Sequence, residues 1–154
     1  MVQAFKKVLS SGIMLSFCLS NLCGCVTSPN RQQIERDKIN EMVLKNADNA
    51  AADARAAKLH FLDCVKEYAI KNSQASVTAT ELAEAAVSNC ELDLMNYQSM
   101  RKMYHSSMGR LTLQSLDEFQ RNEDKAQYKA TAERQELSES GKGLAINTLI
   151  DTRK

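Results

Sequence analysis

The sequence predicts an all-α protein, on the basis of its turn residues, its composition and one long hydrophobic repeat. The 154 residues contain a single proline, Pro29, and only three glycines after residue 24. A β-rich domain needs turn residues about every 8 to 12 positions. Alanine, glutamate, lysine, glutamine, leucine and methionine dominate instead, and these residues favour helix. We therefore expect helices and no sheet.

The longest expected helix spans residues 32–72, where no helix breaker occurs. Apolar residues recur in it at alternating spacings of four and three, which is the pattern of a coiled-coil seam. The seam consists of Val43, Ala47, Ala50, Ala54, Ala57, Phe61, Cys64 and Tyr68. Because its first half is mostly alanine, a partner helix can approach closely along it.

A turn at residues 72–81 is expected to separate this helix from a second one. Thr78 and Glu81 have the spacing of a capping box, in which each side chain satisfies a free backbone N–H at the start of a helix. The helix that follows carries an apolar stripe: Leu82, Ala86, Cys90, Leu94, Tyr97, Tyr104, Met108 and Leu111. A short connection between two long amphipathic helices predicts an antiparallel helical hairpin.

A third, weaker helix is expected after a kink or short turn at residues 105–109. Its apolar positions are Leu113, Leu116, Phe119, Ala126 and Ala130, among many charges. We expect it to end near Leu137, so that the hairpin domain spans residues 32–137. The stretch with Gly141 and Gly143 reads as a flexible linker, and residues 138–154 as linker and tail.

Two cysteines, Cys64 and Cys90, lie on the seams of the first and second helices. Val77, midway between them, falls inside the predicted turn. In an antiparallel hairpin, residues equidistant from the turn lie at the same height, so a Cys64–Cys90 disulfide is predicted. Two buried free thiols are one alternative, and a metal site that adds His60 and Asp63 is another, although the CxxC spacing of a zinc cluster is absent.

The start of the chain has the features of an export signal. Lys6 and Lys7 give it a positive charge, residues 8–22 are mainly apolar, and small residues follow. The apolar segment is too short and too rich in serine for a membrane span, which needs about 20 mostly apolar residues. A removable signal peptide is therefore expected at residues 1–24.

The end of this segment, Leu22-Cys23-Gly24-Cys25, resembles the lipobox of bacterial lipoproteins. The resemblance implies that Cys25 is diacylated on sulfur, with fatty acids such as palmitate, and becomes the N-terminus after cleavage. The sequence departs from the usual pattern at Cys23, where alanine, serine or threonine is common. The alternative is an ordinary secretory signal that is cut without lipidation.

The lipobox resemblance also implies a location. Residues 25–31 would tether the first helix to a membrane through the lipid. Val26 follows the acceptor cysteine in place of the aspartate that resembles an inner-membrane retention signal. We therefore expect the periplasmic face of the outer membrane of a Gram-negative cell. The periplasm is oxidising, which favours the predicted disulfide.

The remaining residues argue against an enzyme. His60 and His105 are the only histidines, and neither belongs to a nucleophile, zinc or phosphate-binding motif. Without residues 1–24 the formal charge falls from +1 to −1, with both signs well mixed, so nucleic acid is not an expected partner. No cofactor is expected. The predicted role is structural or adaptor-like, with an envelope protein as partner or with self-association.

One cluster offers an alternative function. Met100, Met103, His105 and Met108 carry thioether and imidazole groups, which suit Cu(I). The alternative is a periplasmic Cu(I) carrier. The competing interpretation is a flexible methionine-rich core, because on a helical wheel the three methionines spread over about 140° and His105 lies further round.

The chain also has a resemblance to the murein lipoproteins of Gram-negative envelopes. The resemblance rests on the lipid cysteine, the alanine-rich residues 46–58 and the terminal Arg153-Lys154. In that family the last lysine is joined to peptidoglycan, so the resemblance would imply such a link at Lys154. The predicted hairpin departs from the single straight helix of the family. An ordinary charged end on a disordered tail is the competing interpretation.

Overall fold

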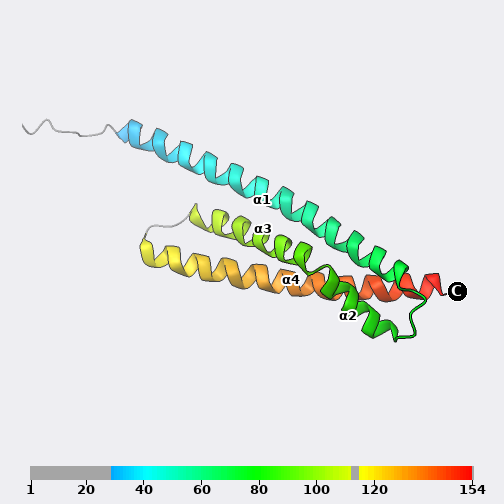
Figure 1. Ribbon diagram of the computed structural model, residues 1–154. Coiled ribbons are helices and arrows are strands. Elements are labelled where there is room, and N and C mark those ends of the chain that lie inside the picture. Colours follow the sequence, from blue (N-terminus) through cyan, green and yellow to red (C-terminus); the bar gives the residue numbers. More distant parts are fainter. Residues whose placement is uncertain (1–28, 112–114, 154) are drawn as a thin grey trace, which may run out of the picture. The chain divides into compact units, whose positions relative to one another are not determined.

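The computed structural model describes residues 29–111 and 115–153, and within these ranges the protein is all-helical (Figure 1). The helices are α1 (Pro29–Lys71), α2 (Ala79–Asn89), α3 (Glu91–Arg110) and α4 (Leu116–Thr152). No described residue lies in a strand. The predicted all-α class is therefore confirmed. None of the described helices is long and apolar enough to span a membrane.

The chain divides into two units, residues 1–37 and residues 38–154. The described part of the first unit, residues 29–37, is the start of α1. Pro29 is the first helical residue, a position where the missing proline N–H costs no hydrogen bond. Residues 29–31 of the predicted tether are therefore helical. The remainder of the tether, residues 25–28, lies outside the described residues.

The hydrophobic core of the second unit is built from all four helices. Phe61, Leu94 and Leu149 are its largest fully buried side chains. The core cluster comprises Phe61, Val65, Ala69, Leu82, Ala83, Ala86, Val87, Cys90, Leu94, Leu137, Ala145 and Leu149. It therefore joins residues far apart in the sequence.

The predicted seam of α1 is buried at Ala47, Ala50, Ala54 and Phe61. Beyond Phe61 the buried positions are Val65 and Ala69, whereas the predicted Cys64 and Tyr68 are only partly buried. A straight helix has about 3.6 residues per turn, so its buried face drifts away from a strict seven-residue repeat. This drift accounts for the one-residue change in register.

The second helix differs from the prediction because it is interrupted at Cys90, which separates α2 from α3. Cys90 has φ −99° and ψ 16°. Its N–H donates to the carbonyls of Ala86 and Val87, both at 3.2 Å. The break expected around residues 105–109 comes directly after them, because α3 continues to Arg110 and α4 begins at Leu116. The capping box of Thr78 and Glu81 is present, and Ser115 with Glu118 forms a second one at the start of α4.

The largest correction concerns the C-terminal residues. The third helix is not weak and does not end near Leu137, because α4 continues to Thr152. It buries Leu137, Gly141, Ala145 and Leu149 along one face. Residues 138–152 are therefore a helix that packs into the core rather than a flexible linker and tail. The glycines that suggested flexibility lie inside the helix, and Gly141 is in close contact with Phe61 of α1.

Candidate functional site: the disulfide and the polar seam between α3 and α4

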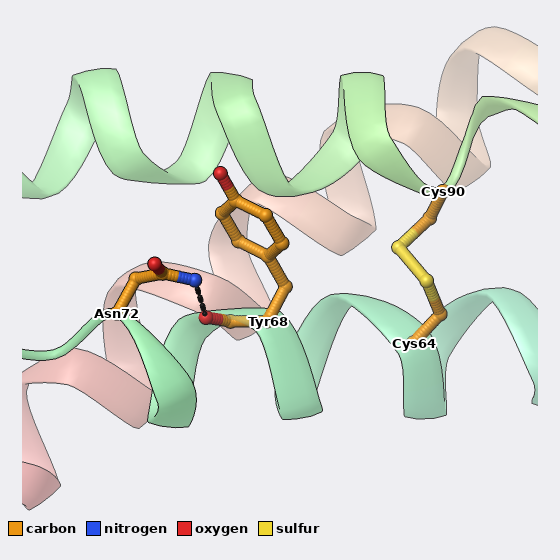
Figure 2. Close-up of a disulfide and its surroundings, with 4 residues drawn as sticks. All are labelled: Cys64, Tyr68, Asn72 and Cys90. Atoms are coloured by element: carbon orange, nitrogen blue, oxygen red, sulfur yellow. Dashed lines mark hydrogen bonds between the residues drawn. A yellow bond between two sulfur atoms is a disulfide. The ribbon is translucent and has the colours of Figure 1, made fainter.

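Cys64 of α1 and Cys90 between α2 and α3 are joined by a disulfide, as Figure 2 shows. Their Cα atoms are 6.0 Å apart, within the range that a disulfide requires. This is the pair that the sequence predicts. Because each sulfur is bonded to the other, neither offers a thiolate to a metal, and His60 and Asp63 acquire no cysteine partner. Within the described residues no group of three or more His, Cys, Asp or Glu side chains could hold a metal ion.

The two sulfurs lie in different surroundings. Cys90 is 1% exposed and belongs to the core cluster, whereas Cys64 is only partly buried. Beside Cys64 is a surface pocket of about 320 Å³, which is also lined by Glu67, Tyr68, Lys71, Asn72 and Asn89. In Figure 2 the ring of Tyr68 points toward α2, while the Asn72 side chain donates to the Tyr68 carbonyl at 2.8 Å. One face of the disulfide is therefore open to the pocket and the other is enclosed.

A series of polar contacts joins α3 to α4, and we call it the polar seam. It contains the pairs Glu91–Arg134, Gln98–Thr131, Arg101–Glu133, His105–Glu133, Ser106–Glu123, Ser106–Asn122 and Arg110–Glu123. The partners on α4 come broadly in reverse order, so the two helices run in opposite directions. Only Leu94 and Ser106 of α3 are fully buried. These hydrogen bonds therefore fix the register of α3 on α4, alongside the apolar contact that Leu94 makes within the core cluster.

Glu133 is the centre of the polar seam. Its carboxylate accepts hydrogen bonds from both Nε and Nη2 of Arg101, with 2.7 Å between Nη2 and Oε1. Nε2 of His105 lies 2.9 Å from the same Oε1. The hydrogen bonds from Arg101 lower the pKa of Glu133, with a smaller contribution from His105, although burial opposes them. The same pairing raises the pKa of Arg101, so this ion pair stays charged over the physiological range.

Glu123 makes a second anchor nearer the end of α3. It accepts the Ser106 hydroxyl, and Nη2 of Arg110 lies 3.3 Å from its Oε1. The Ser106 hydrogen bond is the main reason why the pKa of Glu123 is lowered. Asn122, the preceding residue, donates to the Ser106 carbonyl at 3.1 Å. Two polar side chains of α4, Asn122 and Glu123, therefore meet the buried Ser106 region.

The residues of the proposed copper cluster are dispersed around α3. His105 and Met108 line one pocket of about 270 Å³, but Lys125 and Lys129 line it too. Met103 is 52% exposed, and at about 100° per residue it projects roughly 160° away from His105. Met100 is partly buried and does not line this pocket. With two lysines at the pocket and His105 bound to Glu133, the arrangement gives a Cu(I) ion little support.

The sequence interpretation missed the polar seam. The signal was Arg101 and His105, which are four residues apart and so share a helix face, near the apolar stripe of the predicted second helix. Glu133 of α4 could not be assigned to them without the helix pairing. Cys25, the signal peptide and Lys154 lie outside the described residues.

Comparisons with known proteins identify no relative. The chain matches no protein-family model, no curated protein and no solved structure. Its function must therefore be inferred from its own residues.

Proposed function

We propose that this protein is a lipid-anchored component of the cell envelope with a non-catalytic, structural or adaptor role. The proposal rests mainly on the lipobox-like motif Leu22-Cys23-Gly24-Cys25, which follows two lysines and a short apolar segment. In this proposal Cys25 carries the lipid, and the helical domain faces the periplasm from the outer membrane. A single acyl chain binds membranes only marginally, whereas two or more hold a protein stably.

The Cys64–Cys90 disulfide supports the proposed location in the periplasm. Disulfides persist in oxidising environments such as the bacterial periplasm and are rare in the cytosol. This bond links α1 to the α2–α3 junction, at the edge of the core cluster. A domain that uses a disulfide in this way is suited to an exported protein.

We further propose that α1 pairs with α2 as an antiparallel hairpin closed by the disulfide. Cys64 and Cys90 lie at equal distances along the chain from Val77, which falls in the connection at residues 72–78. Arg153, just after α4, supports that connection, because its Nε donates to the Ser73 carbonyl at 2.7 Å and its Nη2 to the Ala75 carbonyl at 3.2 Å. The C-terminal residues thus help to hold the turn on which the hairpin depends.

Acylation is tested by labelling cells with a clickable palmitate analogue. The wild-type chain should incorporate the label and fractionate with membranes, whereas Cys25→Ser should lose both properties. Cys23→Ser is the matched control, because serine is common at that position of a lipobox, and this variant should remain labelled. Label that persists in Cys25→Ser would contradict the proposed acceptor.

The adaptor role is tested by crosslinking in intact cells followed by mass spectrometry of the purified products. We expect defined crosslinks either to one envelope protein or to a second copy of the chain. The Cys25→Ser variant is the control, since loss of the anchor should reduce crosslinks that depend on membrane attachment. A chain that gives only monomer under all crosslinkers, while still acylated, would contradict an adaptor role.

A further inference from the structure

We infer that the Cys64–Cys90 disulfide exchanges through one sulfur only, and that the pocket beside Cys64 is the entry point for an incoming thiolate. The chemical class of the partner is a thiol, such as a peptide thiol or the cysteine of a dithiol protein. The inference rests on the unequal exposure of the two cysteines. Cys90 is 1% exposed, whereas Cys64 is partly exposed and lines a pocket of about 320 Å³.

The enclosed side of the bond is closed by apolar residues. Cys90 lies in the core cluster together with Phe61, Val87 and Leu94. An attacking thiolate must reach the sulfur that it attacks, and access therefore decides which sulfur reacts. To reach Cys90, a thiolate would have to enter this cluster and lose its hydration, which is costly for a charged group.

The open side offers a place for the incoming molecule. Besides Cys64, the pocket is lined by Glu67, Tyr68, Lys71, Asn72 and Asn89. Of these, Lys71 and the two asparagines have N–H groups that can donate hydrogen bonds. Its volume lies at the lower end of the range for small-molecule sites. A peptide thiol could therefore place its sulfur at Cys64 while its polar groups meet donors in the pocket.

The step balances as an ordinary thiol–disulfide exchange. The incoming thiolate attacks Sγ of Cys64, a new sulfur–sulfur bond forms there, and Cys90 leaves as a thiolate that takes a proton from water. Cys90 precedes α3, whose N-terminus favours a negative charge, whereas burial disfavours it. A second thiol on the incoming molecule can then attack the mixed disulfide, which leaves both cysteines reduced and the partner oxidised. Bond formation follows the same route in reverse, through a mixed disulfide on Cys64.

The test treats the oxidised, folded protein with reduced glutathione at pH 8 for short times, quenches with acid and blocks free thiols with N-ethylmaleimide. Peptide mass spectrometry then locates the glutathione. We expect it on Cys64, with the maleimide on Cys90, in at least about tenfold excess over the opposite arrangement. The same reaction in concentrated urea should lose this preference, because both sulfurs are then exposed. Glutathione mainly on Cys90, an even distribution in the folded protein, or a preference that survives in urea would each overturn the inference.

The role of the pocket is tested with a matched pair of variants. Asn89 lines the pocket and Ser88 does not, yet both are uncharged and exposed at the end of α2. Asn89→Trp should fill part of the pocket and slow the reaction with glutathione several-fold, whereas Ser88→Trp should leave its rate unchanged. Melting temperatures close to that of the wild type would show that both variants are folded. Equal rates for the two folded variants would show that the thiolate does not enter through this pocket.

Discussion

Gly141 of α4 lies so close to the ring of Phe61 in α1 that a Cβ atom at position 141 would be 2.7 Å from Cε1. Phe61 is fully buried and cannot turn away without opening the core. The glycine is therefore a packing residue, which allows α4 to approach α1 closely. A second glycine, Gly143, lies two residues further along the same helix, and a Cβ there would meet nothing within 4 Å.

Alanine substitutions at these two glycines are predicted to change the stability in opposite directions. Gly141→Ala should destabilise the protein by about 1 to 3 kcal/mol, since overpacking outweighs the better helix propensity of alanine. Gly143→Ala should instead stabilise it by about 0.5 to 1 kcal/mol, because alanine favours a helix interior and nothing obstructs the methyl group. Urea unfolding at pH 7 measures both values. Stabilisation by Gly141→Ala equal to that by Gly143→Ala would contradict the close contact with Phe61.

The C-terminal end of α4 is predicted to be part of the cooperative fold. Leu149 is 1% exposed, and Leu149→Ala should cost about 2 to 5 kcal/mol through lost burial and the cavity that it leaves. Ile150, its neighbour, is 51% exposed, so Ile150→Ala should change the free energy of unfolding only slightly. Thermal or urea unfolding of the two variants gives the comparison. If both substitutions were neutral, residues 138–152 would not be packed as described.

The polar seam is predicted to depend on pH through Glu133. Its folded pKa is lowered, chiefly by Arg101, so its contribution is present above the unfolded value of about 4.3 and is lost as pH falls through the folded value. Glu133→Gln should therefore cost about 1 to 2 kcal/mol at pH 7. The cost should shrink as the pH approaches about 3, because the wild-type carboxylate is then increasingly protonated. Urea unfolding at several pH values follows this change.

The control for Glu133→Gln is Glu84→Gln, which alters an exposed carboxylate on α2. It should have little effect at pH 7 or at pH 3. A cost of Glu133→Gln that stays constant between these values, or grows as the pH falls, would show that the ionised carboxylate does not stabilise the seam.

The disulfide is predicted to contribute substantially to stability. It joins residues 26 positions apart, and in the chain-entropy model a loop of this length is worth roughly 3 to 4 kcal/mol. Reduction should lower the melting temperature of the wild type markedly but should leave that of Cys64→Ala unchanged. Circular dichroism with and without reductant measures both effects. A wild-type melting temperature that does not respond to complete reduction would contradict the prediction.

Much of the helical architecture could be predicted from local chemistry. The scarcity of glycine and proline predicted helices, and the Thr78–Glu81 spacing predicted the start of α2, because both depend on residues close in sequence. The cysteine pair followed from its symmetry about the turn. The sequence gives no such local signal for the interruption at Cys90, since neither a proline nor a glycine is found there.

The errors concerned contacts between distant segments. Two glycines so close together suggested a flexible linker, whereas Gly141 packs against Phe61 and Gly143 has open space beside it. A signal was nevertheless present, because Leu137, Gly141, Ala145 and Leu149 recur every fourth residue, and this spacing places them on one helix face. The partner of Arg101 and His105 could not be chosen from the sequence, since many carboxylates were available.

The most direct test of the proposed envelope lipoprotein is the mass of its N-terminal peptide. The protein is extracted from membranes, digested, and analysed by mass spectrometry under conditions that retain lipids. We predict a peptide that begins at Cys25, lacks residues 1–24 and carries a diacylglyceryl group on the cysteine sulfur. An N-terminal peptide that retains residues before Cys25, or that begins at Cys25 or beyond it without lipid, would contradict the proposal.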